Sequence, residues 1–163
     1  MMNLPLLSFL MLHAAAAPPA RAQADSALPK FGEFSVAEEF KGKPAPVDLS
    51  SDPQAGRYRT RLREGAKSGP NFAGHYTIVI WGCGSSCQQF AIVDASTGGV
   101  YFSKEVPYVS FGDRTEEPFG LQFKRNSNLL AVYGHIREDD PKGIFFYTWD
   151  GKRLMFITSI PGE

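Results

Sequence analysis

The chain has 163 residues, and its 17 Lys and Arg side chains balance 17 Asp and Glu side chains, so the formal net charge at neutral pH is zero. This balance argues against bulk nucleic-acid binding, which normally needs a strongly basic domain, and against a polybasic membrane patch. With 16 glycines, 12 prolines and 13% aromatic residues, the composition favours aromatic-rich strands joined by turns over a helical bundle.

The first 24 residues are typical of a signal peptide. An apolar run from Leu4 to Ala17 precedes Ala22-Gln23-Ala24, a small-residue pattern that signal peptidase recognises, so we expect cleavage after Ala24. Removing 24 of 163 residues leaves 139, and only Arg21 is lost among the charged side chains, giving 16 basic against 17 acidic groups. This length is typical of one domain, and the predicted location is the periplasm or the cell exterior, with no stable membrane span after cleavage.

Residues 25–51 are expected to form an extended N-terminal arm, because apolar side chains are scattered irregularly among prolines and charges. A short strand at residues 34–37 could add to the edge of a sheet. Residues 52–163 are expected to form a single β-rich domain.

A helix is predicted from residue 52 to about Ala66. The sequence Ser51-Asp52-Pro53 indicates its start, because Ser or Asp caps free N–H groups and Pro fits the first turn. Gly65 and the Gly69-Pro70 pair are expected to end it. An apolar stripe recurs at steps of three and four residues, formed by Ala55, Tyr58, Leu62 and Ala66.

The same segment carries an arginine at every second position, which is also the period of a strand with one charged face. The capping signal and the scarcity of β-branched residues favour the helix. On either element these side chains could hold an anionic partner, such as a phosphate or an acidic envelope polymer, through bidentate hydrogen bonds. A solubilising surface is the simpler interpretation. The residues are Arg57, Arg59, Arg61 and Arg63.

Seven apolar segments rich in Val, Ile, Phe and Tyr predict strands. Turn-like joins connect them, so neighbours should pair antiparallel, and Asp150-Gly151 predicts a two-residue hairpin turn. Several segments are apolar on both faces, which predicts a sheet covered on both sides. The segments are residues 76–81, 90–94, 100–103, 120–124, 129–135, 144–149 and 154–159.

The expected fold is therefore mainly β (α+β). It is an antiparallel meander of about seven strands, sandwich-like or built as two propeller-blade-like units, with one N-terminal helix packed on it. A complete propeller needs at least four blades, and the chain has residues for about two.

Cys83 and Cys87, separated by three residues, are the two cysteines of the chain. They lie between the strand expected to end at Trp81 and the strand expected to begin near Gln88. After export, a local disulfide would close the neck of this hairpin loop. In the chain-entropy model a five-residue ring contributes only about 2 kcal/mol, so the bond would shape the loop more than it stabilises the fold.

Redox catalysis, cysteine-protease chemistry and a zinc site are the alternatives for these cysteines. Redox pairs usually enclose two residues at a helix N-terminus, whereas three intervene here and no helix is predicted. The papain-like Cys-Gly-Ser-Cys-Trp pattern differs by one residue, and its histidine should lie much farther along the chain than His135. Zinc would need His75 and His135 beside both thiolates, at a spacing unlike common zinc motifs. We therefore expect no metal and no cofactor.

Two motifs stand close together in the chain, Asn71-Phe72-Ala73-Gly74-His75-Tyr76 and Trp81-Gly82-Cys83-Gly84-Ser85-Ser86-Cys87, followed by Ile92-Val93-Asp94 and Thr97-Gly98. Together they resemble a family of uncharacterised secreted proteins of Gram-negative bacteria. The resemblance covers roughly residues 57–101 and implies export to the periplasm and a shared fold. It implies no catalytic residue.

The function predicted first is a non-enzymatic secreted or periplasmic domain that presents the stapled loop to a protein or cell-envelope component. Rigid aromatic side chains and a preorganised loop suit such a contact. The candidate surface comprises His75, Trp81, Ser85, Ser86 and Gln88.

Two alternatives remain open. A small periplasmic thiol redox enzyme or hydrolase would use His75 as base and Cys83 or Ser85 as nucleophile, which requires a distance of about 3.2 Å between them. An oligomeric envelope assembly protein would combine its two blade-like halves with those of other copies.

Overall fold

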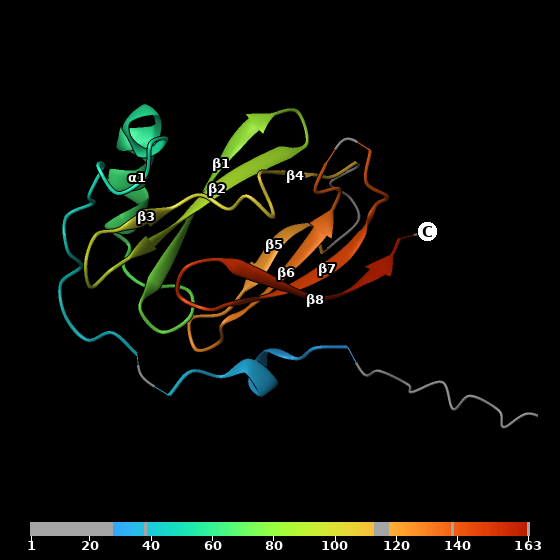
Figure 1. The fold of residues 1–163 in the computed structure, drawn as a ribbon, viewed down its shortest axis with the longest axis horizontal. Helices are drawn as coiled ribbons and strands as arrows, with labels where there is room; N and C mark the ends of the chain where they lie inside the picture. The colour runs from blue at the N-terminus through green and yellow to red at the C-terminus, as the bar shows by residue number, and fades with distance from the viewer. Residues whose placement is uncertain (1–27, 38, 113–117, 138, 163) are drawn as a thin grey trace, which may run out of the picture.

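The computed structural model describes residues 28–37, 39–112, 118–137 and 139–162. The expected signal peptide, residues 1–24, lies outside the described residues. Eight strands form two antiparallel sheets of four, and the expected mainly β fold with one helical segment is confirmed (Figure 1).

The first sheet contains β1 (Tyr76–Gly84), β2 (Cys87–Asp94), β3 (Val100–Tyr101) and β4 (Val109–Ser110). β1 lies along one edge of β2, and the two short strands β3 and β4 share the other edge. The second sheet is a meander in chain order, made of β5 (Gly120–Phe123), β6 (Leu129–Gly134), β7 (Gly143–Trp149) and β8 (Leu154–Pro161).

Each sheet carries apolar side chains on both faces, and each face packs against another part of the chain. Their inner faces share the main core, in which side chains such as Ile92 of β2 and Val132 of β6 are almost completely buried. The helical segment η2 (Ala55–Tyr58) and α1 (Arg59–Ala66) covers the outer face of the first sheet. The N-terminal arm, including the short 3-10 helix η1 (Phe31–Phe34), packs on the outer face of the second. The prediction of a sheet covered on both sides is thus confirmed.

Backbone hydrogen bonds join the two sheets at both ends. At one end, Ser110 of β4 exchanges two hydrogen bonds with His135, just after β6, at N···O distances of 2.9 and 2.7 Å. At the other end, the N–H groups of Ala73 and Gly74 donate to the carbonyls of Ser127 and Arg125 at 3.1 and 2.6 Å. The core is therefore held by main-chain contacts as well as by side-chain packing.

The segment 57–63 is helical, as predicted, but the expected start at residue 52 is wrong: η2 begins at Ala55 and α1 at Arg59, and neither has a side-chain cap. The Asp52 carboxylate accepts a hydrogen bond from the Gln54 N–H at 2.8 Å, and the 3-10 turn η2 then leads into α1. Gly65 does not end the helix, contrary to expectation. It lies inside α1 against β1, where an added Cβ would overlap both methyl groups of Val79. Only glycine allows the helix to approach this closely.

Two local expectations are wrong, and the structure adds one strand. Residues 34–37 form no strand: Phe34 ends η1, and Ser35 makes a single bridge to Ser127. The β7–β8 turn spans four residues, 150–153, because the Asp150 carboxylate accepts the N–H groups of the third and fourth residues and widens it. The two-residue strand β4 was not predicted, since its order depends on neighbours distant in sequence.

Candidate functional site: the stapled hairpin

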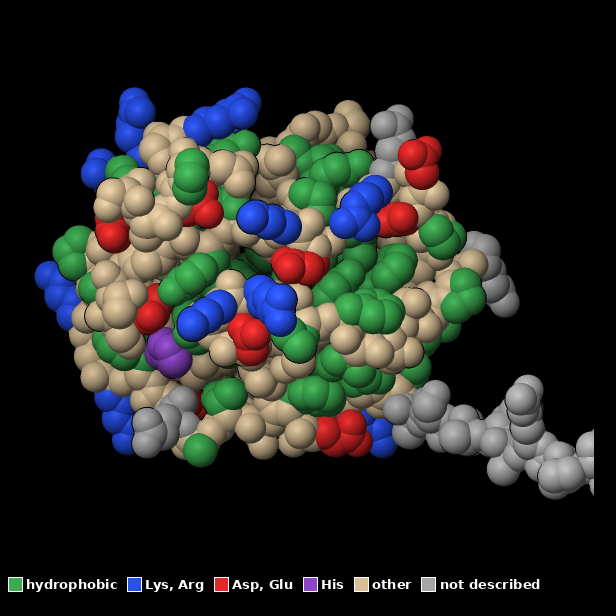
Figure 2. Space-filling view, in the orientation of Figure 1, with side chains coloured by type: hydrophobic (Ala, Val, Ile, Leu, Met, Phe, Trp, Pro, Cys, Tyr) green, Lys and Arg blue, Asp and Glu red, His purple; other side chains and the backbone are tan. Residues whose placement is uncertain are grey.

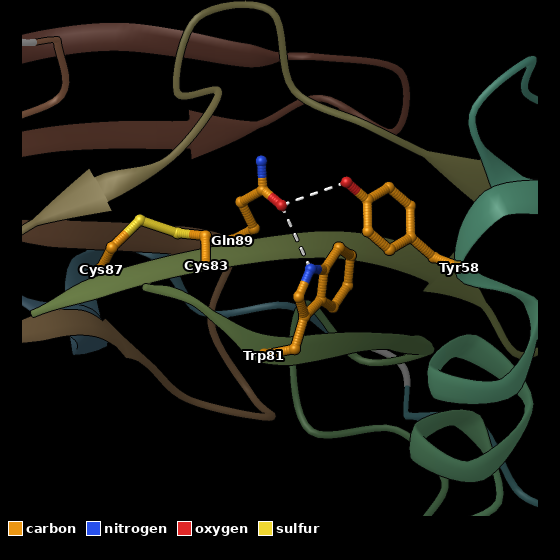
Figure 3. Close-up of a disulfide and its surroundings, with 5 residues drawn as sticks. All are labelled: Tyr58, Trp81, Cys83, Cys87 and Gln89. Carbon is orange, nitrogen blue, oxygen red and sulfur yellow. Dashed lines mark hydrogen bonds between the residues drawn. A yellow bond between two sulfur atoms is a disulfide. The ribbon is translucent and has the colours of Figure 1, made fainter. Parts of the chain in front are cut away.

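The β1–β2 hairpin ends in a tight, cross-linked turn. Strand pairing continues to Gly84 and Cys87, so only Ser85 and Ser86 connect the strands, and Ser86 adopts a left-handed conformation with φ of 52°. Cys83 and Cys87 form a disulfide with Cα atoms 5.2 Å apart, as predicted (Figure 3). We refer to residues 82–86 as the hairpin tip.

β4 supports the tip from the side. Cys87 pairs with Ser110, and the Phe111 N–H donates to the Ser86 carbonyl at 2.9 Å. These bonds lie on the β2 side of the hairpin, so the disulfide and β4 restrain the turn independently. The tip is held in one conformation by covalent and hydrogen bonds together.

The tip presents small side chains and backbone to solvent. Gly82, Cys83, Gly84 and Ser85 are exposed, and Ser86 is half-buried. Figure 1 shows the hairpin at the periphery of the molecule, at the end of the first sheet where β4 lies. Of the predicted binding residues, Ser85 and Ser86 thus lie at an accessible position.

Trp81, expected on the binding surface, is only 6% exposed. Its ring packs on Tyr58 from the helical segment, with centroids 4.7 Å apart, and on Phe102. Its indole N–H donates to the Gln89 side-chain carbonyl at 3.2 Å, which also accepts the Tyr58 hydroxyl at 3.2 Å (Figure 3). Trp81 therefore anchors the base of the hairpin under η2 and is not a contact surface. Gln89, which no sequence pattern singles out, satisfies two polar groups there.

Gln88 also faces inward. Its side-chain oxygen is buried and has no hydrogen-bond partner among the described residues. It lies against Gly120 of β5, where an added Cβ would overlap that oxygen. Gln88 therefore contributes to the contact between the sheets. Like Trp81, it does not belong to an exposed binding surface.

His75 lies at the opposite end of the hairpin from the disulfide. Tyr76 pairs with Asp94, eight positions before the end of β1, so at about 3.3 Å per residue His75 is about 25 Å along the strand from Cys83. Its Nε2 is 3.9 Å from the Asp94 carboxylate, and its ring packs on Tyr76 with centroids 4.1 Å apart. The expected base and nucleophile are therefore not brought together, and Cys83 is tied up in the disulfide.

The turn around His75 has a structural role. Phe72 is fully buried, Ala73 and Gly74 both have positive φ, and Phe72 and Tyr76 form a bridge around them. The Gly74 carbonyl accepts the N–H of Phe40 from the arm at 3.0 Å. Burial raises the pKa of the Tyr76 phenol. The turn at residues 72–76 therefore connects the N-terminal arm with both sheets.

The zinc alternative gains no support from the geometry. In the described part of the chain no three His, Cys, Asp or Glu residues are placed to hold a metal ion. His135 lies near β4, but its Nδ1 donates to the Asp140 carbonyl at 2.8 Å, and His75 is at the far end. The four-ligand set that the zinc alternative requires is not assembled.

The four arginines are exposed on η2 and α1. Because an α-helix turns about 100° per residue, Arg59 and Arg63 share a face and Arg61 points away from both. The Arg57 guanidinium lies 5.6 Å from the centre of the Tyr58 ring. The four arginines therefore do not form a single row, although Figure 2 shows Lys and Arg side chains gathered over the end of the molecule that carries α1.

The chain matches no protein-family model, no curated protein and no solved structure. Within the described ranges, none of the helices has the length and apolar character needed to cross a bilayer. The function is therefore inferred from the geometry of the hairpin itself.

Proposed function

We propose that the protein is a secreted or periplasmic, non-enzymatic binding domain whose hairpin tip contacts a protein or another component of the cell envelope. The observation that carries the proposal is a solvent-exposed turn restrained by both a disulfide and β4. A loop that is already ordered loses little conformational entropy on binding, so more of the contact energy is left for affinity. The likeness of the two motifs to a secreted family supports the same location.

Backbone groups beside the tip suggest how a partner would bind. The Asn71 side chain donates to the Ile78 carbonyl at 3.1 Å and accepts the Ile78 N–H at 2.8 Å, so it caps the outer edge of β1 at that residue. Ile80 and Gly82 are two and four residues farther on, and their backbone groups point the same way. Within the described residues no hydrogen bond covers them, and the Ile80 side chain is 38% exposed. A partner strand could add to the sheet here, next to the tip.

Site-specific photo-crosslinking in cells tests this proposal. A photoreactive residue at Ser85 should give a defined adduct, whereas the same residue at Ser96, an exposed turn serine at the opposite end of β2, should not. Replacing Gly82 with Pro should weaken the Ser85 adduct, because proline has no N–H to donate to an added strand. Identical adducts at both serines, or none at Ser85, would refute the proposal.

A pull-down from periplasmic extract gives an independent readout. The wild type should retain partners that the double variant Cys83→Ser, Cys87→Ser holds more weakly, because the unstapled tip must be ordered on binding. Equal recovery by both proteins would show that the tip is not the binding site.

Self-association is a second candidate, because β8 has an exposed apolar segment. Met155, Phe156 and Ile157 are 40%, 58% and 37% exposed, and β8 forms an edge of the second sheet without a charged side chain. Uncharged apolar edges promote pairing with another chain. Sedimentation equilibrium should then show dimers that Phe156→Lys dissociates, and a monomer at high concentration would remove this candidate.

A further inference from the structure

A groove separate from the hairpin tip lies between the N-terminal arm and the C-terminal end of α1. Its volume is about 450 Å³, within the range of small-molecule pockets. Five apolar residues line it, four consecutive ones from the arm and one from the helix: Pro44, Ala45, Pro46, Val47 and Ala66.

The side of the groove formed by the N-terminal arm is fixed by hydrogen bonds and close packing. The Ala45 N–H donates to the Ala95 carbonyl at 2.8 Å, and the Asp48 N–H donates to the Gly98 carbonyl at 2.8 Å. Gly98 has a φ of 81° and lies so close to the Pro46 carbonyl that a Cβ would overlap it. Proline rings restrict the backbone between these anchors. A ligand would therefore meet a preformed surface.

The charged residues that line the groove are all basic. Lys43 comes from the arm, and Arg63 and Lys67 lie one turn apart at the end of α1. No Asp or Glu belongs to the lining, and none of the three cations forms an ion pair with a described residue. Cations at a helix C-terminus are common because they offset the helix dipole, but this does not account for Lys43. A lining that combines apolar and basic side chains matches an anionic amphiphile.

We propose that this groove binds a single-chain anionic amphiphile, a monomeric fatty-acid carboxylate, with its alkyl chain against the apolar lining residues and its carboxylate against Arg63, Lys67 and Lys43. The apolar residues remove alkyl surface from water, and guanidinium and ammonium groups donate charge-assisted hydrogen bonds to a carboxylate. The groove belongs to the arm and α1, so this inference does not depend on the function of the hairpin tip.

Titration calorimetry with ten-carbon amphiphiles below their micelle concentrations tests the ligand class. Sodium decanoate should bind saturably at one site, and octanoate, shorter by two methylenes, should bind about tenfold more weakly. Decyltrimethylammonium, with the same chain and the opposite charge, should not bind there. Equal binding of the cationic and anionic probes would overturn the proposal. Binding to vesicles of anionic lipid without binding of decanoate would also overturn it, in favour of a membrane surface.

Charge reversal locates the site. The double variant Arg63→Glu, Lys67→Glu should weaken decanoate binding at least tenfold, and Lys43→Glu should weaken it severalfold. Arg61→Glu is the matched control, because Arg61 is exposed on the same helix but lies outside the groove, and it should change affinity less than twofold. Far-ultraviolet circular dichroism verifies that each variant is folded. An equal loss in Arg61→Glu, or full affinity in both Lys43→Glu and the folded double variant, would place the ligand elsewhere.

Discussion

Opening the disulfide measures how far the hairpin tip depends on its staple. The bond closes a ring of five residues, from Cys83 to Cys87, and such a ring restricts the unfolded chain by only about 2 kcal/mol. In the folded protein, the β4 pairing and the bond from Phe111 to Ser86 keep the hairpin in register without it. We therefore expect Cys83→Ser, Cys87→Ser to fold and to lose about 2 kcal/mol, which lowers Tm by about 6 to 8 °C in a domain of this size.

Urea denaturation followed by circular dichroism measures this loss, and an unchanged dependence on urea would show that the fold is intact. Reduction of the wild type should reproduce the shift, and Ser85→Ala, which keeps the ring, should leave Tm almost unchanged. A loss above about 4 kcal/mol would mean that the disulfide stabilises part of the first sheet in addition to the hairpin tip. No loss at all would refute the entropy argument, because the ring would then cost the unfolded chain no freedom.

Three other substitutions examine the packing behind the hairpin, each by urea denaturation. Gly65→Ala should cost about 1 to 3 kcal/mol, because its methyl group would overlap the side chain of Val79. Gln89→Leu should cost about 1 to 3 kcal/mol, because the buried indole N–H of Trp81 loses its acceptor. Burial raises the pKa of Tyr147 to about 12, above its value near 10 in the unfolded chain. The contribution to stability that corresponds to this shift is complete below pH 10 and is lost as the pH rises through 12, so Tyr147→Phe should lose less stability than the wild type over that interval.

Each of these substitutions has a control. Gly56→Ala places a methyl group where no atom lies within 4 Å, so it should cost nothing, and a loss equal to that of Gly65→Ala would contradict the packing argument. Gln89→Glu keeps an acceptor and should retain more stability than Gln89→Leu. Parallel alkaline curves for Tyr147→Phe and the wild type would show that the phenol is not the responsible group.

Much of the fold could be predicted because its signals are local. Runs of Val, Ile and aromatic residues marked seven of the eight described strands, although β3, expected over residues 100–103, spans only Val100–Tyr101. The apolar stripe marked the helical segment, although the expected start at residue 52 precedes the observed one at Ala55. β4 could not be found this way, because Val109 and Ser110 carry no repeating pattern and become a strand only by pairing with β2. The 3-10 turn at residues 31–34 likewise depends on packing against the second sheet.

The candidate site was predicted less well, because burial depends on what covers a strand. Cys83 and Cys87 were paired correctly because their link is local. Side chains alternate between the two faces of β1, so Trp81 lies on the same face as Val79. α1 covers that face, and Trp81 is therefore buried, but the sequence alone did not show where the helix packs. His75 was grouped with the cysteines by sequence distance, although seven residues of strand separate it from Cys83.

The backbone links between the two sheets determine how the protein can unfold. Each sheet consists of neighbouring strands and would form quickly by itself, as local contacts do. Yet backbone hydrogen bonds connect Ser110 with His135 at one end and Gly74 with Arg125 at the other, so separating the two sheets breaks these hydrogen bonds. The two halves should therefore behave as one cooperative unit, with slowly exchanging amides in β2 and β6 that become accessible in the same global event.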